Sequence, residues 1–496
     1  NRIGVWPHPF HPTIRNVTRP DILVFVGVNG RKTYHFSIHV QGVLKAIGNE
    51  TDSIWFSVAD TNGFGNIHTN DGGWNGLRFE DTPIENDSSI FEYCHLSFGK
   101  AVGDSVNCFG GAIRVIRMNK MAIRHSTIYN NYAFYWGGGI YAFKSDLVVE
   151  HVKITRNYAG NDGMIYGYGG GLCFVSSAPN IKYSTFTLNN STGIGGGVSF
   201  EFSDPLLLNC VFDDNYSALG GGLGMLRSSS NRMIANLLFV NNESYFFGGG
   251  LAIITSSPQL TNLTIANNSS SMGGGLYCNE YADPKIYNSI LWGNTTYDTI
   301  GSQVWIWDVY SEPGFYNCNI QYGLDTFGGS SFHGIFENCI EAEPQFINPS
   351  LSDFHIQSGS CLNNGTVPPT IGLPDFDLDM LPRIANGTVD LGAYEYNGTI
   401  GLNEVAFTNR KMRIWPMPIK ENSIIEIEAE SDGLSQFTLI DRSGRVMDSN
   451  RSIHLYQGIN SIRLSAIYNG FNRLSQGVYF LEFEFLGQKS VSKIIL

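Results

Sequence analysis

The fold of this chain is decided by the stretch NNSTGIGGGVSF at residues 189–200. The same order of Asn, triple glycine and alternating apolar residues returns in NESYFFGGGLAI at residues 242–253 and in NSSSMGGGLYC at residues 268–278. The glycine triplets are 25 to 32 residues apart and begin at Gly137, Gly169, Gly195, Gly220, Gly248 and Gly273, with Gly110-Gly111-Ala112 as an earlier degenerate copy. Self-similarity at such a period is the signature of a solenoid built from stacked repeats.

Two further columns describe one turn of this solenoid. Each triplet opens an alternating apolar run, such as Val198 and Phe200, and alternation at period two predicts a strand with one buried face. Ahead of the triplets lies a column of asparagines: Asn131, Asn157, Asn189, Asn215, Asn242, Asn268 and Asn294. Three short strands per turn of about 26 residues predict an all-β protein, a parallel β-helix of about ten to twelve coils. Coils stack about 4.8 Å apart, so asparagine amides can bond along the axis and glycines permit the corners.

The composition excludes several other classes of protein. The 496 residues include 57 Gly and 45 Asn, but the glycines have no collagen period. A hydrophobic fraction of 42% is too high for a disordered chain, and only 15% of the residues are charged. No apolar run reaches the roughly 18 residues that a membrane helix needs, so we expect no transmembrane segment.

Charge is distributed unevenly along the chain. Residues 1–182 hold 16 basic and 14 acidic side chains, whereas residues 183–382 hold three basic residues, Arg227, Arg232 and Lys285, against 18 acidic ones. Because residues 183–382 are strongly acidic, they repel polyanions, and we expect no nucleic-acid partner. It also lacks the cations with which a polysaccharide lyase neutralises uronate carboxylates.

The composition changes after Tyr396, where the glycine repeat stops. In residues 478–485, Tyr479, Leu481 and Phe483 alternate with polar residues, which predicts a half-buried antiparallel strand in a small β-sandwich. We therefore expect an extended arm at residues 1–20, the β-helix at 21–340, a closing cap and linker at 341–400, and the sandwich at 401–496.

Several motifs resemble known families. The Asn and GGG coils, the stretch 44–79 and the segments 354–360 and 389–396 resemble right-handed β-helix proteins secreted by Bacteroidetes-type bacteria. The motifs WPMP at 415–418, GVYF at 477–480 and SKIIL at 492–496 resemble a type IX secretion sorting domain. This resemblance implies a secreted protein, extracellular or on the outer cell surface, whose residues 401–496 engage the secretion machinery. Because the chain begins at Asn1 rather than Met, we also expect that a signal peptide has been removed.

The sequence offers weak support for catalysis. A glycosidase needs two carboxyls about 5 to 10 Å apart, but the adjacent Asp213 and Asp214 point to opposite sides of a strand. The basic cluster that includes Arg114 and Arg124 is expected to be solvated surface. His125 and His151 are 26 residues apart and should stack on adjacent coils, with no third ligand for a metal. We therefore assign no catalytic residue, metal ligand or cofactor.

Two cysteines stand 21 residues apart, which is close to one coil. Cys318 and Cys339 each follow an asparagine, and stacked positions are near enough for a disulfide. The sequence favours the other possibility, a ladder of two buried free thiols. Cys278 lies at an inward position and is expected in the core.

Aromatic residues at the corners provide a candidate binding surface. The corner between Asn157 and Gly169 is longer than its neighbours, and adjacent corners are rich in aromatic residues. The candidate binding residues are Tyr132, Tyr135, Trp136, Asp162, Tyr166, Tyr168, Tyr245 and Phe246. Such side chains can stack on sugar rings or contact a protein, or they can fold back to cover the corner.

These observations favour a secreted structural or adhesive protein. The basic amino-terminal part and the acidic middle suggest head-to-tail contacts between copies of the chain, which form filaments when the rotation does not close. The alternative is a carbohydrate-binding or polysaccharide-degrading β-helix, either a lyase or a glycosidase. The partners implied are copies of itself or surface glycans.

Overall fold

The computed structural model divides the chain into two compact units, Asn1–Asn397 and Gly398–Leu496. It describes residues 23–25, 28–29, 32–33, 35–83, 85–103, 107–161, 167–228, 231–297, 300–384, 387–396, 412–415, 423–429, 431–441, 446–467, 478–485 and 488–495. The expected arm at residues 1–20 lies outside the described residues.

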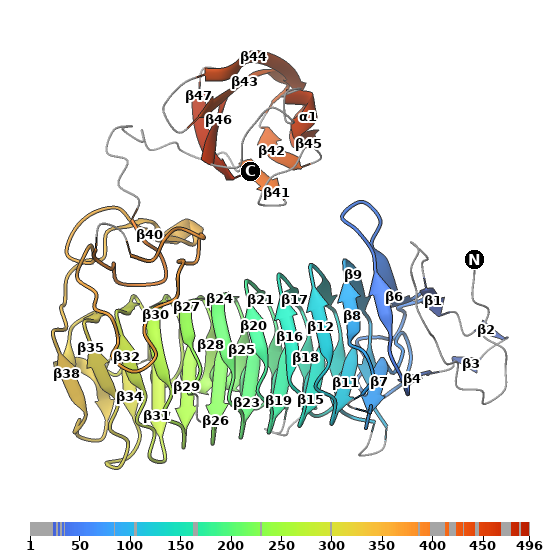
Figure 1. Cartoon of the computed structure of the whole chain (residues 1–496), viewed down its shortest axis with the longest axis horizontal. Helices are drawn as coiled ribbons and strands as arrows, with labels where there is room; N and C mark the ends of the chain where they lie inside the picture. Colours follow the sequence, from blue (N-terminus) through green and yellow to red (C-terminus); the bar gives the residue numbers. More distant parts are fainter. Residues whose placement is uncertain are drawn as a thin grey trace. The chain divides into compact units, whose positions relative to one another are not determined.

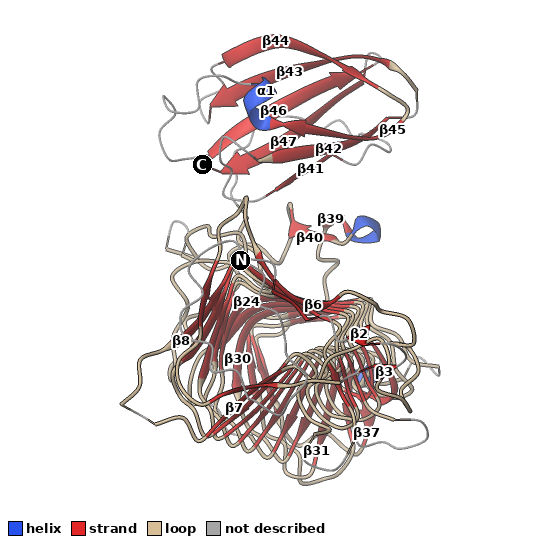
Figure 2. Ribbon diagram, turned by 90° about the vertical axis from the view of Figure 1, so that its right-hand side faces the viewer, coloured by secondary structure: helices blue, strands red, loops and turns tan. Residues whose placement is uncertain are grey.

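The first unit is a parallel β-helix (Figures 1 and 2). One sheet contributes one strand per coil and holds eleven described strands, in agreement with the ten to twelve coils predicted. These strands are β4 (Ile38–Val40), β7 (Leu77–Glu80), β11 (Ile113–Ile116), β15 (Ile140–Phe143), β19 (Leu172–Val175), β23 (Val198–Glu201), β26 (Leu223–Leu226), β29 (Leu251–Ile254), β31 (Leu276–Asn279), β34 (Val304–Ile306) and β37 (Gly328–Gly329).

A larger sheet of 19 described strands bends along its middle, so that most coils contribute two strands or one long one. Its members are β1 (Leu23–Phe25), β5 (Lys45–Ile47), β6 (Ile54–Val58), β8 (Ser89–Glu92), β9 (Cys94–Ser97), β12 (Met121–Arg124), β13 (Thr127–Tyr129), β16 (Leu147–Glu150), β17 (Lys153–Thr155), β20 (Asn180–Lys182), β21 (Thr185–Thr187), β24 (Leu206–Asp213), β27 (Ile234–Val240), β30 (Gln259–Ala266), β32 (Lys285–Tyr287), β33 (Ile290–Trp292), β35 (Gly314–Tyr316), β36 (Asn319–Ile320) and β38 (Ile335–Glu337).

A third sheet of short strands completes the coils. It contains β10 (Lys100–Ala101), β14 (Tyr132–Ala133), β18 (Tyr158–Ala159), β22 (Asn190–Ser191), β25 (Tyr216–Leu219) and β28 (Glu243–Phe247). The remaining described elements of this unit are β2 (Val28–Asn29), β3 (Lys32–Thr33), the 3-10 turns η1 (Leu324–Thr326) and η2 (Pro349–Leu351), and the hairpin β39 (Phe346–Asn348) and β40 (Asp353–Ile356).

The interior is filled by columns of apolar side chains from successive coils. Phe186, Phe212 and Phe239 stack face to face, with ring centroids 4.7 and 4.6 Å apart. Cys278 is fully buried in the same core, as the alternation predicted. Burial of each side chain against its neighbour one coil away removes apolar surface from water, and this drives the coils to stack.

The glycine triplets mark a corner where neighbouring backbones approach closely. The first glycine of each triplet has left-handed backbone, as at Gly195 with a φ of 72°. A Cβ at the second glycine would meet backbone of the next coil, because at Gly196 it would lie 2.3 Å from the carbonyl oxygen of Gly221. The corner therefore requires glycine for conformation at one position and for space at the next.

The asparagine column forms a buried ladder along the axis, as predicted. The Asn215 Nδ2 donates to the Asn242 Oδ1 at 2.9 Å and to the Phe186 carbonyl at 2.8 Å. Its Oδ1 accepts from the backbone N–H and the side-chain amide of Asn189, at 3.1 and 3.0 Å. The same pattern continues from Asn131 to Asn294, so each amide is satisfied by neighbours on both sides.

Residues 341–396, here called the lateral segment, pack on the flank of the solenoid (Figure 1). Phe354 and Ile356 of β40 join a cluster with Leu238 and Val240, which point outward from β27. This placement differs from the end-closing position that the sequence suggested. The carboxyl end of the core is instead covered from within its last coil, where Phe327 and Phe336 pack around Phe315.

The second unit is an antiparallel β-sandwich. A sheet of β41 (Met412–Trp415), β42 (Ile424–Ala429) and β45 (Gly458–Arg463) faces a sheet of β43 (Gly433–Asp441), β44 (Val446–Leu455), β46 (Val478–Phe485) and β47 (Gln488–Ile495), and one short helix, α1 (Leu464–Ile467), follows β45. Tyr479, Leu481 and Phe483 are buried between the sheets, so the predicted alternation of this strand is confirmed.

The asparagine ladder leads to a first prediction. Replacement of Asn215 by Leu removes the side-chain partner of the Phe186 carbonyl and of the Asn189 N–H, and the Asn242 Oδ1 keeps only the Asn215 backbone N–H. We expect the free energy of unfolding to fall by about 3 kcal/mol or more, measured by chemical denaturation with circular dichroism. Asn190→Leu is the control, because Asn190 is a half-buried asparagine of the preceding coil that lies opposite Tyr216. Equal stability of the two variants would show that the ladder does not hold the coils together.

Candidate functional site

Four of the predicted aromatic residues fold back onto the solenoid. Tyr132 is buried, and its hydroxyl donates to the Gly160 carbonyl at 2.9 Å. The rings of Trp136 and Tyr168 stack with centroids 5.1 Å apart, and Trp136 and Tyr135 both pack against Phe109. These corners cover the outward face of the eleven-stranded sheet and form a second apolar layer. They are therefore part of the packed structure.

The other predicted binding residues do not join this group. Tyr245 and Phe246 lie on β28, several coils away, and remain exposed at 60% and 37%. Their rings contact each other edge to face at 4.6 Å. Asp162 and Tyr166, from the long corner, lie outside the described residues.

A more exposed aromatic cluster lies near the carboxyl end of the solenoid, and the sequence analysis missed it. Tyr281 and Tyr310 stack on neighbouring coils, with centroids 5.1 Å apart, and are 62% and 60% exposed. Trp307, which is also exposed, packs edge to face on Phe247. Acidic residues flank this cluster, since Asp308 accepts hydrogen bonds from the backbone N–H groups of Glu280 and Tyr310.

Two basic residues of the early coils, Arg114 and Lys100, are buried in internal contacts, whereas Arg117 and Lys120 are exposed as the sequence predicted. Arg114 was expected on the solvated surface, but it is buried and paired with Glu80. Arg114 can be buried because the corner loops cover the outward face of the eleven-stranded sheet, to which β11 belongs. Lys100 is buried as well, and its ammonium donates to three backbone carbonyls of the loop at residues 63–71, at 2.8 to 3.2 Å. These cations hold the fold together and do not line an open groove.

The structure brings no catalytic or metal-binding constellation together in its described part. His125 and His151 stack at 4.9 Å as predicted, between Tyr93 and Tyr183. Asp213 accepts a hydrogen bond from Asn241, and burial raises its pKa. Among the described residues, no group of three or more His, Cys, Asp or Glu side chains is arranged to hold a metal ion.

The lateral segment binds the flank through a second asparagine column. This column consists of Asn209, Asn236, Asn262, Asn288 and Asn317. These asparagines all have left-handed backbone and occupy the turn position that His125 and His151 occupy in earlier coils. Each side-chain amide donates to a backbone carbonyl of the lateral segment. Asn288 also accepts from the Thr366 N–H at 2.8 Å, so this residue recognises the segment as a β-strand would.

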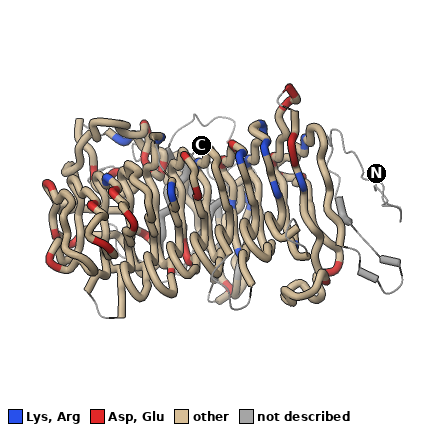
Figure 3. Tube along the Cα trace, turned by 90° about the horizontal axis from the view of Figure 1, so that it is seen from below, with Lys and Arg blue, Asp and Glu red and all other residues tan. Residues whose placement is uncertain are grey.

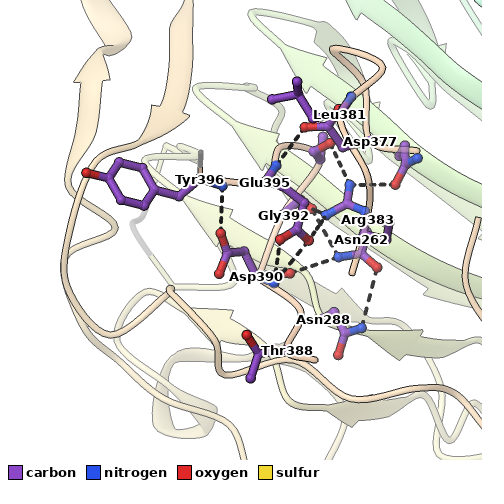
Figure 4. Close-up of polar contacts among 12 residues, drawn as sticks. Asn262, Asn288, Asp377, Leu381, Arg383, Thr388, Asp390, Gly392, Glu395 and Tyr396 are labelled. Atoms are coloured by element: carbon purple, nitrogen blue, oxygen red, sulfur yellow. Dashed lines mark hydrogen bonds and ion pairs between the residues drawn. The ribbon is translucent and has the colours of Figure 1, made fainter. Parts of the chain in front are cut away.

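A buried charge network locks the lateral segment in place (Figure 4). The Arg383 guanidinium donates to the Glu395 carboxylate at 2.8 Å and to the Asn236 Oδ1 at 2.6 Å. Asp377 and Asp390 are also buried, and their carboxylates accept backbone N–H groups within the segment. Burial raises the pKa of Glu395 to about 7, and Arg383 opposes this shift. The network therefore consists of structural carboxyls and leaves none open to a substrate.

His355 joins the hairpin to the rest of the segment. Its two ring nitrogens lie 2.6 Å from Asp353 and 2.8 Å from Asp379, and the ring packs on Tyr394. Burial lowers the pKa of His355, but the bonds to both carboxylates outweigh burial and raise it to about 9. The imidazolium is thus a clamp between two loops, since neither nitrogen is available as a base.

The sequence contains a signal for this column that the analysis did not use. The asparagines from Asn209 to Asn317 recur at spacings of 27, 26, 26 and 29 residues, at the turn where earlier coils have aromatic rings. The change from aromatic rings to asparagine marks where the flank is covered. Periodicity shows the column, whereas only the folded chain shows what it binds.

The fold and the site define a class of protein. The described residues form a parallel β-helix, and a separate β-sandwich unit follows it in the chain. A family model described as the right handed beta helix region matches residues 64–242, and one described as the secretion system C-terminal sorting domain matches residues 413–496. No curated protein matches the chain significantly. Within the described residues, no helix is long and apolar enough to cross a membrane.

The chain is therefore a secreted right-handed β-helix protein that carries the C-terminal sorting domain of type IX secretion. Both expectations raised by the motif resemblance are confirmed. The sorting domain places the protein outside the cell or on its outer surface.

The lateral segment leads to a second prediction. In Arg383→Met, the Glu395 carboxyl loses its cationic partner and must take up a proton to remain buried. We expect faster amide hydrogen exchange in residues 375–396, because the local free energy of unfolding falls by about 3 kcal/mol. The loss should grow from pH 5 to pH 8, because a carboxyl whose folded pKa is raised stabilises the fold at low pH and loses this effect as pH rises.

The double variant Arg383→Met with Glu395→Gln is the matched control, because it removes the unpaired charge as well. It should recover part of the stability and lose the pH dependence. Unchanged exchange in the single variant would contradict a locking role for Arg383.

Proposed function

We propose that this protein is a structural or adhesive subunit of an extracellular assembly, in which solenoids join end to end. The observation that carries the proposal is that the strands of the terminal coils have a partner on one side only, within the described residues. At the carboxyl end these are β37 and β38, and at the amino end β5 is paired on one side among the described strands. A strand edge with unpaired N–H and C=O groups is a template for another chain.

The two ends of a solenoid are complementary by construction. Each coil presents its strands in the same order and direction, because successive coils are related by one repeated translation. The last strand of the eleven-stranded sheet therefore offers an edge on which a parallel strand of a second copy can pair. The lateral segment packs on the flank, on outward residues of β27, β30 and β33, so its described contacts do not occupy this edge.

Charge favours the same head-to-tail arrangement. Residues 1–48 contain six Lys or Arg and one Asp, whereas residues 286–343 contain seven Asp or Glu and no Lys or Arg. Figure 3 shows Asp and Glu positions gathered at the carboxyl end of the solenoid, whereas its amino-terminal half carries Lys and Arg as well as Asp and Glu positions. Opposite charges speed encounter and set the orientation of docking, and like ends repel. This contact is heterologous, so it continues into a filament when its rotation does not close.

The third prediction tests this assembly. We expect the full-length protein at low ionic strength to form linear oligomers, seen by negative-stain electron microscopy and analytical ultracentrifugation. The double reversal Asp325→Lys with Glu337→Lys replaces two exposed acidic residues of the last coil and should lower association by at least about tenfold. Salt should weaken association of the unmodified protein, because the Debye length falls to about 8 Å near 0.15 M.

The matched control reverses two exposed acids of the middle coils, Asp214→Lys with Glu243→Lys, which gives the same net charge. This variant should associate like the unmodified protein. Monomers at every concentration and salt level would overturn the proposal. Equal loss of association in both variants would show that net charge, and not the end, controls it.

A second candidate function is glycan binding by the exposed cluster of Tyr281, Trp307 and Tyr310. The specific support is the combination of exposed rings with adjacent carboxylates, since sugars stack on aromatic faces and donate hydroxyl hydrogen bonds to acids. A rigid solenoid holds these rings in place, so little conformational freedom is lost on binding.

The fourth prediction concerns this cluster. If it binds glycans, Tyr310→Ala should weaken binding by about tenfold, measured on a glycan array and then by titration calorimetry. Tyr456→Ala, which removes an equally exposed tyrosine of the sorting domain, is the control. Absence of any glycan retained by the unmodified protein would eliminate this candidate and leave the structural function.

A further inference from the structure

Two cysteines face each other across the last two coils. The pairs Tyr316 with Glu337 and Asn319 with Ile340 are in register, which places Cys318 opposite Cys339. Both cysteines follow an asparagine with left-handed backbone, so the two turns have the same shape. Neighbouring strands lie about 4.8 Å apart, within the Cα separation that a disulfide spans. The Cys318 thiol donates to the carbonyls of Ile286 and Tyr316, and the Cys339 thiol donates to that of Glu337.

No other pair among the eight cysteines occupies the same position of adjacent coils. Cys94 and Cys210 belong to the same column, but their neighbours in the next coil are Ser126 and Leu237. Cys210 is fully buried, and burial raises its pKa to about 12. Register thus selects Cys318 and Cys339, and Cys210 offers a matched cysteine that has no partner in the adjacent coils.

The two thiols differ in access to solvent. Cys318 is fully buried beneath the last coil, and burial raises its pKa. Cys339 is only partly buried at the open end of the core, and the neighbouring Cys318 thiol lowers its pKa. An oxidant can therefore reach Cys339 first, and the buried partner lies opposite it on the neighbouring coil.

We propose that Cys318 and Cys339 are a modification site, at which oxidation outside the cell forms a disulfide that staples the last coil to the one before it. The environment favours this reaction, because secreted proteins leave the reducing cytosol. The proposal does not depend on end-to-end assembly. The oxidant is a low-molecular-weight disulfide.

The chemistry proceeds by two exchange steps. The Cys339 thiolate attacks one sulfur of the small disulfide, whose S–S bond breaks, and the departing thiolate takes up the proton that Cys339 released. The Cys318 sulfur, on losing its proton, then attacks the Cys339 Sγ of the mixed disulfide and expels the second small thiolate, which that proton neutralises. Two protein thiols are oxidised and one small disulfide is reduced to two thiols.

The staple has a mechanical consequence for the end of the solenoid. The closed loop includes η1 and the residues Phe327, Phe332 and Phe336, which cover Phe315. This coil has a neighbour on one side only within the described chain, so it opens more easily than an internal coil. A cross-link over some twenty residues restricts its open states and should slow amide exchange there by roughly tenfold to a hundredfold.

The experiment uses the reduced full-length protein, treated with oxidised glutathione and then alkylated. No Lys or Arg lies between Lys285 and Arg383, so a protease that cuts after Asp and Glu is used, because Asp325 and Glu337 separate the two cysteines. The expected result is a pair of peptides joined through Cys318 and Cys339 that separates on reduction. Hydrogen exchange of residues 319–338 should slow in the oxidised protein.

Variants provide the controls. Cys339→Ser should abolish the linked peptides and the change in exchange, whereas Cys210→Ser should retain both. Peptide mapping of the unmodified protein needs no variant and remains decisive if one variant does not fold. The proposal is overturned if both thiols of the folded protein remain open to alkylation after oxidation, or if Cys339 links to Cys361 or to a second copy instead.

Discussion

The structure depends on one constraint, the repeated axial contact between coils about 4.8 Å apart. Residues at equivalent positions of successive coils lie above one another. Each position is therefore best filled by a residue type that packs or bonds well against another residue of the same type. Phenylalanine stacks on phenylalanine, as Phe186, Phe212 and Phe239 do, and asparagine bonds to asparagine from Asn131 to Asn294. Where the backbones of adjacent coils nearly touch, only glycine fits, because a Cβ at Gly196 would overlap the next coil.

The same constraint explains how the solenoid gains binding surfaces without catalytic groups. Along the axis, the outward-facing columns change from one residue type to another, whereas the interior columns stay apolar. The turn that holds His125 and His151 becomes an asparagine column from Asn209 onward, and there the lateral segment binds. Arg114 and Lys100 of the early coils are buried in internal contacts. The middle and last coils are left acidic, which suits contacts with a basic end of another copy better than the chemistry of acidic polysaccharides.

The terminal coils of the solenoid carry features that its internal coils do not combine. A repeat satisfies its hydrogen bonds through its neighbours, so the terminal coils are the least satisfied part of a solenoid. At the carboxyl end, three features occur together: strands with one partner among the described residues, acidic side chains from a stretch (residues 286–343) that contains no Lys or Arg, and the Cys318 and Cys339 pair. The proposed disulfide would form there in an oxidising medium and would hold in place the edge that the proposed assembly uses.

The sequence by itself determined the coil, the asparagine and glycine columns, the inward position of Cys278 and the identity of the sorting domain. These features are local or strictly periodic, so spacing alone reveals them. Only the tertiary structure decided that Trp136 and Tyr168 fold back while Tyr245 stays exposed, that Arg114 is buried, and that residues 341–396 bind the flank rather than the end. Each of these depends on what covers an outward side chain, which comes from residues distant in the chain and follows no period.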